Sequence, residues 1–396
     1  MKRLNVGNLL CITFVALALL LQEGTAAFAA MPQPVRHICG VWQGVTSPSI
    51  GTSTNFLNGV AAISPNNVWA VGSYGNGSGG FTLVEHWDGT KWKVVASPNV
   101  NASPSEELLG VAAISSNNIW AVGDYYTASH IQQSLIEHWD GKSWSVVSSP
   151  NVASVFAILT AISAISATDI WAVGNSSSLQ GYQPLIEHWN GKSWSIVSSP
   201  SLQEDQLTGV VSIASNNVWA VGYGAGTYGI QTLIEHWNGI SWSVVSSSGP
   251  GLATNTLNGV AAISANNIWA VGEDANSSTP SSTFAPLIEH WDGSSWSIVT
   301  SPLQGTSDLL NGIAAVSASN IWAVGDYRNS IDSMGPYFTL IEHWNGTTWS
   351  AVRSPSPGSP ANDLVAAARV PATSSVWTVG FTQNSTSSQT LTAFNC

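Results

Sequence analysis

Short apolar stretches alternate with polar turns over most of the chain, and one arrangement of them returns about every fifty residues. In the first complete unit the apolar stretches are Gly59–Ser64, Val68–Gly72, Leu83–Trp87 and Trp92–Ala96. An Asn-Asn turn separates the first two stretches, and an Asp-Gly turn separates the last two. Runs of this length between such turns are typical of β-strands joined in tight hairpins. Each unit therefore predicts four short antiparallel strands.

All twenty tryptophans occupy three positions of this repeat. The first position lies in a V/I-W-A/T-V-G motif and holds Trp69, Trp120, Trp171, Trp219, Trp269, Trp322 and Trp377. The second ends an L-V/I-E-H-W motif and holds Trp87, Trp139, Trp189, Trp237, Trp291 and Trp344. The third lies five residues later and holds Trp92, Trp144, Trp194, Trp242, Trp296, Trp349 and, near the N-terminus, Trp42. Repeated four-stranded units are typical of β-propeller blades, and we expect these side chains to pack between the blades.

The two ends of the chain are complementary fragments of one unit. The last unit, from Leu364, has two strands and a third strand ending at Phe394, which we place at the tryptophan position. The fourth strand is supplied by the segment after Trp42. The sequence thus predicts an all-β fold, a seven-bladed β-propeller of four-stranded antiparallel blades over residues 38–396, whose last blade is completed by the N-terminal strand.

In this alignment Cys39 and Cys396 both fall on the turn glycine, Gly346 in the sixth unit. A disulfide between them would close the cut hairpin, and in terms of loop-closure entropy it could stabilise the ring by roughly 5 kcal/mol. The alternative is a pair of free thiols.

The first residues predict export. Lys2 and Arg3 precede the apolar run Leu9–Leu21, and Ala27-Phe28-Ala29 has the small residues of a cleavage site. This is the pattern of a secretory signal peptide over residues 1–29, with 30–37 as an N-terminal lead; the alternative is a membrane anchor. Cleavage near Ala29 would change the formal net charge from −12 to −13 by removing Lys2, Arg3 and Glu23. We therefore expect a secreted or cell-surface protein with no nucleic-acid partner and no stable membrane insertion.

The order of motifs, V/I-W-A-V-G, then E-H-W, then W-S-x-V, resembles the kelch repeat. In kelch units an apolar strand ends in glycine, an aromatic residue lies near the end of the third strand, and a tryptophan follows in the fourth strand. The Asp/Asn-Gly-x-x-Trp turn is similar to the Asp-box hairpin of sialidase-like propellers. The resemblance covers roughly residues 38–396. The chain departs from kelch in having one glycine where kelch usually has two, and from the Asp-box in lacking the residue between Asp and Gly. The resemblance implies the fold and says little about activity.

A Glu-His pair precedes the second tryptophan in six units, beginning with Glu85-His86. Such pairs could bind metal or transfer protons. However, copies spread around a ring do not converge, and neighbours in a strand point to opposite faces of the sheet. We therefore expect these groups to be hydrogen-bonded within or between blades. The last unit is expected to carry Thr392-Ala393 at the same place.

The variable segments between the second and third strands contain all eight tyrosines. We expect Tyr74, Tyr125, Tyr126, Tyr182, Tyr223, Tyr228, Tyr327 and Tyr337 to lie in or beside these loops, on one rim of the ring. The same rim should carry most acidic residues: Glu106, Glu107, Asp124, Glu204, Asp205, Glu273, Asp274, Asp308, Asp326, Asp332 and Asp363. Among the cations, Arg328 should lie on this rim, and Lys91, Lys142 and Lys192 on the opposite one.

An acidic rim rich in tyrosine favours a non-catalytic binding protein whose ligand is an extracellular glycan or protein. We take the tyrosines, with Asp124, Asp274 and Asp326, as candidate ligand-binding residues. No cofactor is required, although rim carboxylates could bind Ca²⁺, and we expect a monomer.

Two alternatives stay open: a carbohydrate-active hydrolase or lyase that uses rim carboxylates, and a purely structural or adhesive scaffold. A copper site like that of galactose oxidase would need a cysteine, and both Cys39 and Cys396 are assigned to the closure. A sialidase-like site would need an arginine cluster, whereas the exported chain has Arg36, Arg328, Arg353 and Arg369 in unrelated contexts.

Overall fold

The computed structural model describes residues 39–77, 79–100, 105–150, 156–178, 181–200, 204–226, 229–250, 254–276, 283–330, 335–358 and 360–396. The signal peptide, its cleavage site and the lead over 30–37 lie outside the described residues, so they stay predictions. Residues 36–396 group into one compact unit. Among the described residues there is no helix long and apolar enough to cross a membrane.

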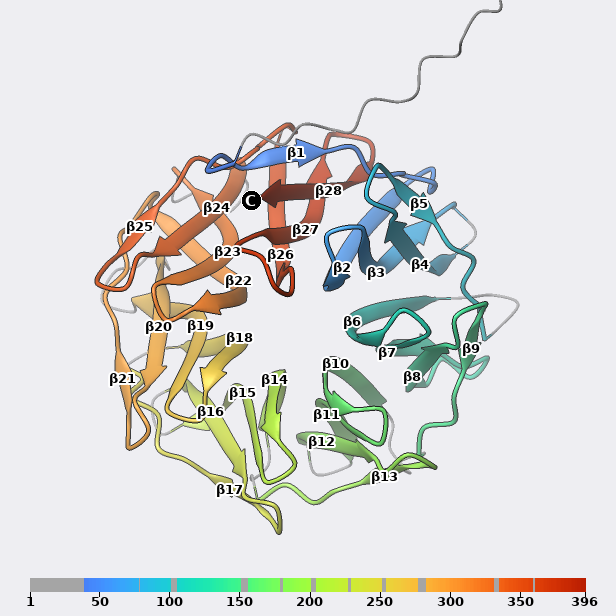
Figure 1. Cartoon of the computed structure of the whole chain (residues 1–396), viewed down its shortest axis with the longest axis horizontal. Coiled ribbons are helices and arrows are strands. Elements are labelled where there is room, and N and C mark those ends of the chain that lie inside the picture. Colours follow the sequence, from blue (N-terminus) through green and yellow to red (C-terminus); the bar gives the residue numbers. More distant parts are fainter. Residues whose placement is uncertain are drawn as a thin grey trace, which may run out of the picture. The chain divides into compact units, whose positions relative to one another are not determined.

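The described residues form a ring of blades, each an antiparallel sheet of four strands (Figure 1). The first strands are β2 (Thr54–Ser64), β6 (Glu106–Ser115), β10 (Phe156–Ser166), β14 (Gln206–Ala214), β18 (Asn255–Ser264), β22 (Ser307–Ser317) and β26 (Ala361–Arg369). The second strands are β3 (Asn67–Gly75), β7 (Asn118–Tyr126), β11 (Asp169–Ser178), β15 (Asn217–Gly226), β19 (Asn267–Asn276), β23 (Asn320–Arg328) and β27 (Val376–Gln383). We number the blades 1 to 7 in this order.

The third and fourth strands complete each blade toward the outside of the ring. The third strands are β4 (Gly80–Trp87), β8 (Gln132–Trp139), β12 (Gly181–Trp189), β16 (Gly229–Trp237), β20 (Thr283–Trp291), β24 (Tyr337–Trp344) and β28 (Ser388–Asn395). The fourth strands are β5 (Trp92–Val94), β9 (Trp144–Val146), β13 (Trp194–Ile196), β17 (Trp242–Val244), β21 (Trp296–Ile298), β25 (Trp349–Ala351) and, in blade 7, β1 (Gln43–Val45). The predicted all-β propeller is confirmed, with about seven blades.

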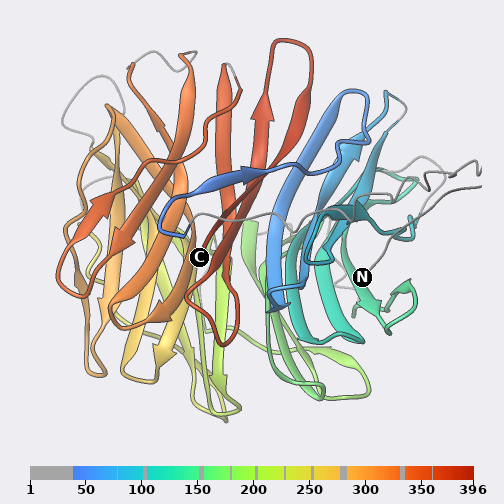
Figure 2. The ribbon, with the colours of Figure 1, turned by 45° about the horizontal axis from the view of Figure 1, so that its top comes forward.

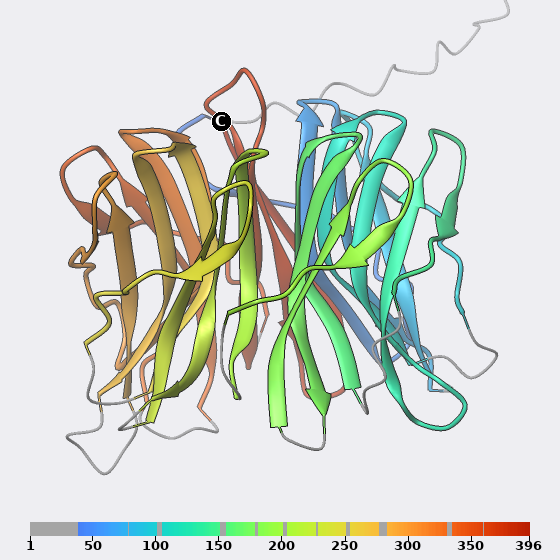
Figure 3. The ribbon, with the colours of Figure 1, turned by 90° about the horizontal axis from the view of Figure 1, so that it is seen from below.

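The strands run between two rims (Figure 3). One rim, here called the loop rim, carries the connections from second to third strands and those from blade to blade. The other, the turn rim, carries the tight turns of the first and last hairpins of each blade. The first three strands of a blade extend further toward the loop rim than expected: β2 begins at Thr54 and β3 continues to Gly75. Cross-strand pairing therefore continues beyond the part of the repeat that is nearly identical between units.

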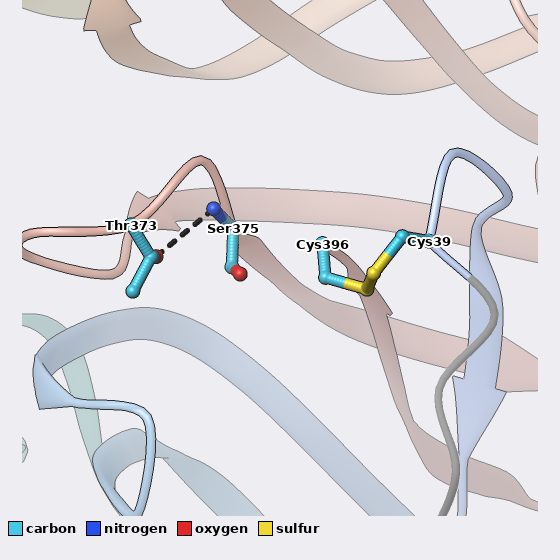
Figure 4. The surroundings of a disulfide bond; sticks show 4 residues. All are labelled: Cys39, Thr373, Ser375 and Cys396. Atoms are coloured by element: carbon cyan, nitrogen blue, oxygen red, sulfur yellow. Dashed lines mark hydrogen bonds between the residues drawn. A yellow bond between two sulfur atoms is a disulfide. The ribbon is translucent and has the colours of Figure 1, made fainter.

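The predicted closure of the ring is present. β1 pairs antiparallel with β28, so the two ends of the chain lie side by side (Figures 1 and 2). Cys39 and Cys396 form a disulfide with a Cα–Cα distance of 4.7 Å across a sequence separation of 357. The bridge lies near the turn containing Thr373 and Ser375 (Figure 4).

The register of β28 differs by one residue from the sequence alignment. Phe394 pairs with Trp377 as His343 pairs with Trp322 in blade 6, so it takes the histidine position. Asn395 takes the place of the second tryptophan, and Cys396 follows it. The expected placements of Phe394 on the tryptophan, Cys396 on the turn glycine and Thr392-Ala393 on the Glu-His pair are therefore wrong. The alignment failed because the sequence of β28 retains no motif of the repeat from which its register could be read. In the structure the hydrogen bonds with β27 define that register.

The tryptophans of the first class link each blade to the next. Trp120 of blade 2 lies 4.9 Å from Trp189 and 5.6 Å from Trp194 of blade 3, between ring centroids. Trp377 of blade 7 contacts Trp87 and Trp92 of blade 1 in the same way, at 5.0 and 5.2 Å. These contacts confirm that the tryptophans of the repeat pack between blades around the whole ring.

The glutamates of the Glu-His pairs are structural, as expected. Each is buried and accepts a hydrogen bond from a serine of the preceding blade: Ser47 to Glu85, Ser97 to Glu137, Ser149 to Glu187, Ser199 to Glu235, Ser247 to Glu289 and Ser301 to Glu342. The histidines bond within their own blade, as His86 Nε2 does to Asn67 Oδ1 at 2.9 Å.

Burial raises the pKa of these glutamates, to about 8 for Glu85 and Glu137 and to about 7 for Glu187 and Glu342. Desolvation disfavours the charged form, and one serine hydroxyl offsets it only in part.

Candidate binding surface on the loop rim

Charge is unevenly distributed between the two rims. The loop rim carries the described acidic residues Glu106, Glu107, Asp124, Glu204, Asp205, Glu273, Asp274, Asp308, Asp326 and Asp363 at the starts of first strands, at the ends of second strands and in the preceding linkers. The lysines of the hairpin turns, Lys91, Lys142 and Lys192, lie on the turn rim. The expected excess of acidic residues on the loop rim is therefore present.

Most of these carboxyl groups are held inside the rim. Glu106 accepts hydrogen bonds from the backbone N–H of Val100, and Asp308 accepts them from Gln304 and Gly305, so both fix linkers. Asp124 and Asp326 are 2% and 6% exposed. These candidate ligand-binding carboxyls face the interior, whereas Asp274 is only half-buried.

Burial and crowding change the protonation of these acids. Burial raises the pKa of Asp124 to about 7. Burial, and then the neighbouring Asp363, raise the pKa of Asp326, and burial raises that of Asp363, which accepts a hydrogen bond from Asn311 Nδ2 at 2.9 Å. Two carboxyls close together in a low-dielectric site cannot both ionise easily, so the loop rim carries less negative charge at neutral pH than its acid count suggests.

All seven described tyrosines lie in strands, not in loops, and Tyr228 lies outside the described residues. Several are engaged at blade edges: Tyr74 stacks on Phe81 at 5.2 Å, Tyr327 packs against Phe338 at 5.5 Å, and Tyr125 packs against the core between blades 1 and 2. They lie at or near the strand ends that border the connections between second and third strands, as expected, because these strands extend further than the repeat predicted. These tyrosines serve packing in part.

Tyr223 and Tyr337 are also half-buried. The Tyr223 hydroxyl donates to Gln206 Oε1 at 3.2 Å. The ring of Tyr337 lies beneath the guanidinium of Arg328, with Cζ 5.1 Å from the centroid, which is a cation–π contact within blade 6.

Two tyrosines remain well exposed, Tyr126 at 37% and Tyr182 at 41%, and they belong to adjacent blades. A single parallel pair, Gln132 of β8 with Phe156 of β10, joins blades 2 and 3 into one eight-stranded sheet. Tyr126 pairs with Gln132 across β7 and β8, and its hydroxyl donates to Gln132 Oε1 at 3.1 Å. Phe156 meets Tyr182 edge to face at 5.9 Å.

These contacts place Tyr126, Gln132, Phe156 and Tyr182 in one row across the two blades. We call this row, with His130 and Glu204 at its two ends, the blade 2–3 strip.

The backbone at both ends of the strip is tightly specified. In blade 2, Thr127 N–H donates to Ile131 O at 2.8 Å and His130 N–H to Thr127 O at 2.9 Å. In blade 3, Glu204 N–H donates to Tyr182 O at 2.7 Å. His130 and Glu204 have φ of 58° and 70°, a left-handed conformation that non-glycine residues adopt at a cost. Strained positions of this kind concentrate at functional sites.

A groove of about 550 Å³ and one of about 330 Å³ lie beside blades 7 and 6, and a third of about 540 Å³ borders the strip. Ser105, Tyr126, Thr127, Ala128 and His130 line the third groove. Of these three grooves, the third is the one lined by an exposed tyrosine, Tyr126. The strip therefore combines a groove with exposed aromatic side chains, and we take it as the candidate binding surface in the described part of the rim.

The central channel offers a smaller space of about 350 Å³ lined by the first strands. Several of its polar side chains are bonded to the next blade, as Asn58 Nδ2 is to Leu108 O at 3.0 Å and Thr160 Oγ1 to Leu207 O at 2.9 Å. These bonds hold the blades together. Within the described residues, no three His, Cys, Asp or Glu side chains are grouped so as to hold a metal ion. Binding of Ca²⁺ therefore stays an untested prediction.

Sequence reasoning found Tyr126 and Tyr182 but not Phe156, Gln132, His130 or Glu204 as their neighbours. In the register of the other blades the position of Phe156 is held by Glu204 or by a small residue (Thr54, Ser105, Thr254, Ser307 and Ala361), and this difference was the signal available. Its proximity to Tyr126 depends on the parallel pair between β8 and β10, and that pair cannot be read from a repeat pattern.

Comparison with known proteins supports the fold. No family model matches the chain, and no curated protein matches it. Among solved structures, a chain described as "YCF48 bound to D1 peptide" is similar with a TM-score of 0.54 and 14% identity, over 90% of this chain and 97% of that chain. Together with the repeated four-stranded blades, this similarity places the chain among β-propeller repeat proteins; the more specific kelch-like relationship stays a prediction.

Proposed function

We propose that this protein is a non-catalytic binding propeller, secreted or held at the cell surface, that binds a segment of a partner protein on its loop rim. The observation that carries the proposal is the blade 2–3 strip, with two exposed tyrosines, a phenylalanine edge and a bordering groove on a rigid scaffold. Tyrosine provides flat apolar area with a polar tip at little entropic cost, which suits protein recognition.

Two further observations support this function. The similar solved propeller is described as bound to a peptide. In addition, the Cys39–Cys396 bond is of the kind that persists in oxidising compartments, which agrees with export and an extracellular partner.

The test is a selection of peptides from a random display library on the purified full chain, followed by binding to Tyr126→Ala/Tyr182→Ala. We expect the double variant to lose at least about tenfold in affinity, because exposed aromatic anchors carry much of the energy of such interfaces. Ile240→Ser/Val244→Ser is the matched control, since Ile240 and Val244 are 86% and 54% exposed on blade 4 in and beside its turn-rim hairpin.

Equal loss of affinity in both double variants, or selected peptides whose binding is insensitive to the tyrosine changes, would argue against the strip.

A glycan array on the same chain tests the carbohydrate alternative. Strip-dependent glycan binding without peptide binding would replace the proposed partner by a glycan. Full function after exchange of the blade 2 and blade 3 loops with those of other blades would instead indicate a scaffold. Thermal melts with calcium and with chelator test the calcium prediction.

A further inference from the structure

We infer that the partner segment recognised by the blade 2–3 strip carries arginine or lysine side chains that lie on the exposed tyrosine rings, the one on Tyr182 beside Glu204. The inference rests on the proposed function and specifies the chemistry of its ligand. It is argued from charge, from aromatic geometry and from a comparison within the chain.

Within the described residues, blades 2 and 3 carry no lysine or arginine on the loop rim. Glu204 is exposed and bonded through its backbone to Tyr182, and Glu107 lies half-buried at the start of the blade 2 sheet. In the described residues of blades 2 to 5, the lysines lie on the turn rim, and Arg328, the described arginine of the loop rim, belongs to blade 6. A surface of this sign attracts basic segments and repels acidic ones.

The aromatic rings give that attraction a specific geometry. A guanidinium over the face of a tyrosine is held by the ring quadrupole, and a nearby carboxylate can accept its N–H groups. Tyr126 and Tyr182 are exposed enough to offer ring faces, and the edge-to-face contact with Phe156 holds Tyr182 in place. A peptide with an aliphatic residue beside the cation would also fill the bordering groove.

Blade 6 contains the same arrangement already satisfied from within the chain. Gly123-Asp124-Tyr125 of blade 2 matches Gly325-Asp326-Tyr327 of blade 6, but the next residue is Tyr126 in one and Arg328 in the other. Arg328 pairs across strands with Tyr337 and lies over its ring, whereas Tyr126 pairs with Gln132. The chain thus places a guanidinium on a tyrosine at one junction, whereas Tyr126 and Tyr182 at the other are 37% and 41% exposed.

The experiment compares matched peptides on the full chain. A strip-dependent peptide from the selection is resynthesised with each arginine replaced by lysine, by neutral citrulline or by glutamate, and affinities are measured by fluorescence anisotropy at two salt concentrations. We expect citrulline to weaken binding by about fivefold or more, lysine to weaken it less, and salt to weaken only the charged peptides.

The protein variant Glu204→Gln should reduce the affinity of the arginine peptide and leave that of the citrulline peptide unchanged, with Glu106→Gln of the same rim as control. Because Glu106 is buried against Val100, the melting temperature of each variant is measured as well. Selected peptides without basic residues, or equal binding of arginine and citrulline peptides, would overturn the inference and leave the proposed function standing. Absence of any strip-dependent peptide would reject both.

Discussion

Two junctions in the ring, between blades 2 and 3 and between blades 6 and 7, join neighbouring blades through one parallel residue pair into an eight-stranded sheet. The pairs are equivalent, Gln132 with Phe156 and Tyr337 with Ala361, yet the surfaces differ. At the 6–7 junction Arg328 covers Tyr337, and Ala361 contributes no ring. At the 2–3 junction Tyr126 and Tyr182 are 37% and 41% exposed, and Phe156 lies in the row between them. The same backbone can therefore carry either an internally satisfied surface or one that offers a binding site.

The junctions differ in their interior as well. Blade 2 meets blade 3 through Trp120 and two tryptophans, and through the hydrogen bond from Ser149 to Glu187 at 2.8 Å. Blade 6 meets blade 7 through one tryptophan pair, Trp322 and Trp42 at 5.3 Å, in a cluster that is otherwise aliphatic, because Asn395 and Ala393 replace the second tryptophan and the glutamate. The 6–7 junction therefore has fewer aromatic contacts than the 2–3 junction, and the disulfide links the ends of β1 and β28 within blade 7.

The largest effect should follow from removing that link. Cys39→Ser/Cys396→Ser is expected to lower the free energy of unfolding by up to about 5 kcal/mol, because a very long loop is no longer closed in the unfolded chain. Hydrogen exchange should show β1 and β26–β28 losing protection first, with β6–β13 of the 2–3 junction retaining it. Uniform loss of protection across both junctions would contradict the asymmetry.

Truncation of the tryptophans compares the two interiors directly. Trp120→Ala should cost about 3–5 kcal/mol, since a buried indole is replaced by a cavity between two other rings. Trp322→Ala should cost less, because Trp322 is only partly buried and has one tryptophan neighbour in the next blade. Urea unfolding of the two variants provides the measurement, and a larger cost for Trp322→Ala would reverse our ranking of the junctions.

The sequence predicted those features of the ring that recur in every unit of the repeat. The tryptophan positions and the completion of blade 7 by the Trp42 segment were evident because near-identical units reveal a missing fragment. The register of β28 was not, because Leu391–Asn395 shares no motif with E-H-W. Burial of Asp124 and Asp326 was also missed, because side chains at the ends of second strands turn inward or outward according to neighbours in the next blade, and those neighbours are set by packing between blades.

Titration distinguishes the junctions by their buried acids. Glu187 has a pKa raised by burial to about 7, so the folded chain binds a proton that the unfolded chain has released above its ordinary pKa. Its contribution is therefore fully present at low pH and is lost as pH rises to about 7. Glu187→Gln should remove up to about 2 kcal/mol of this pH dependence between pH 5 and 8. At the 6–7 junction the equivalent position, 393, is alanine, and the buried acids with raised pKa are instead Asp326 and Asp363 on the loop rim.

Thermal melts of both chains across this range provide the measurement. The histidines with lowered pKa, such as His138 and His236, are neutral in the unfolded chain only well above their ordinary pKa, so the carboxyls dominate above about pH 7.5. Stability of the unaltered chain should decrease from about pH 7.5 to 9, since Glu85 and Glu137 titrate near pH 8. A stability that increases with pH over that interval would show that these carboxyls are ionised in the folded chain.

The smallest effect on stability, and the sharpest on binding, should come from converting one junction into the other. Tyr126→Arg/Gln132→Tyr gives blade 2 the Arg–Tyr pair that Arg328 and Tyr337 form in blade 6. Both positions are on the surface, so the free energy of unfolding should change by no more than about 0.5 kcal/mol. The new guanidinium would occupy the place proposed for the ligand's cation and repel it, so basic peptides should bind at least about tenfold more weakly.

Tyr126→Phe keeps the ring without the charge and should retain binding. Unchanged affinity in the converted chain would mean that the ligand's cation does not bind at the aromatic row of the 2–3 junction, because an arginine in that place would repel it.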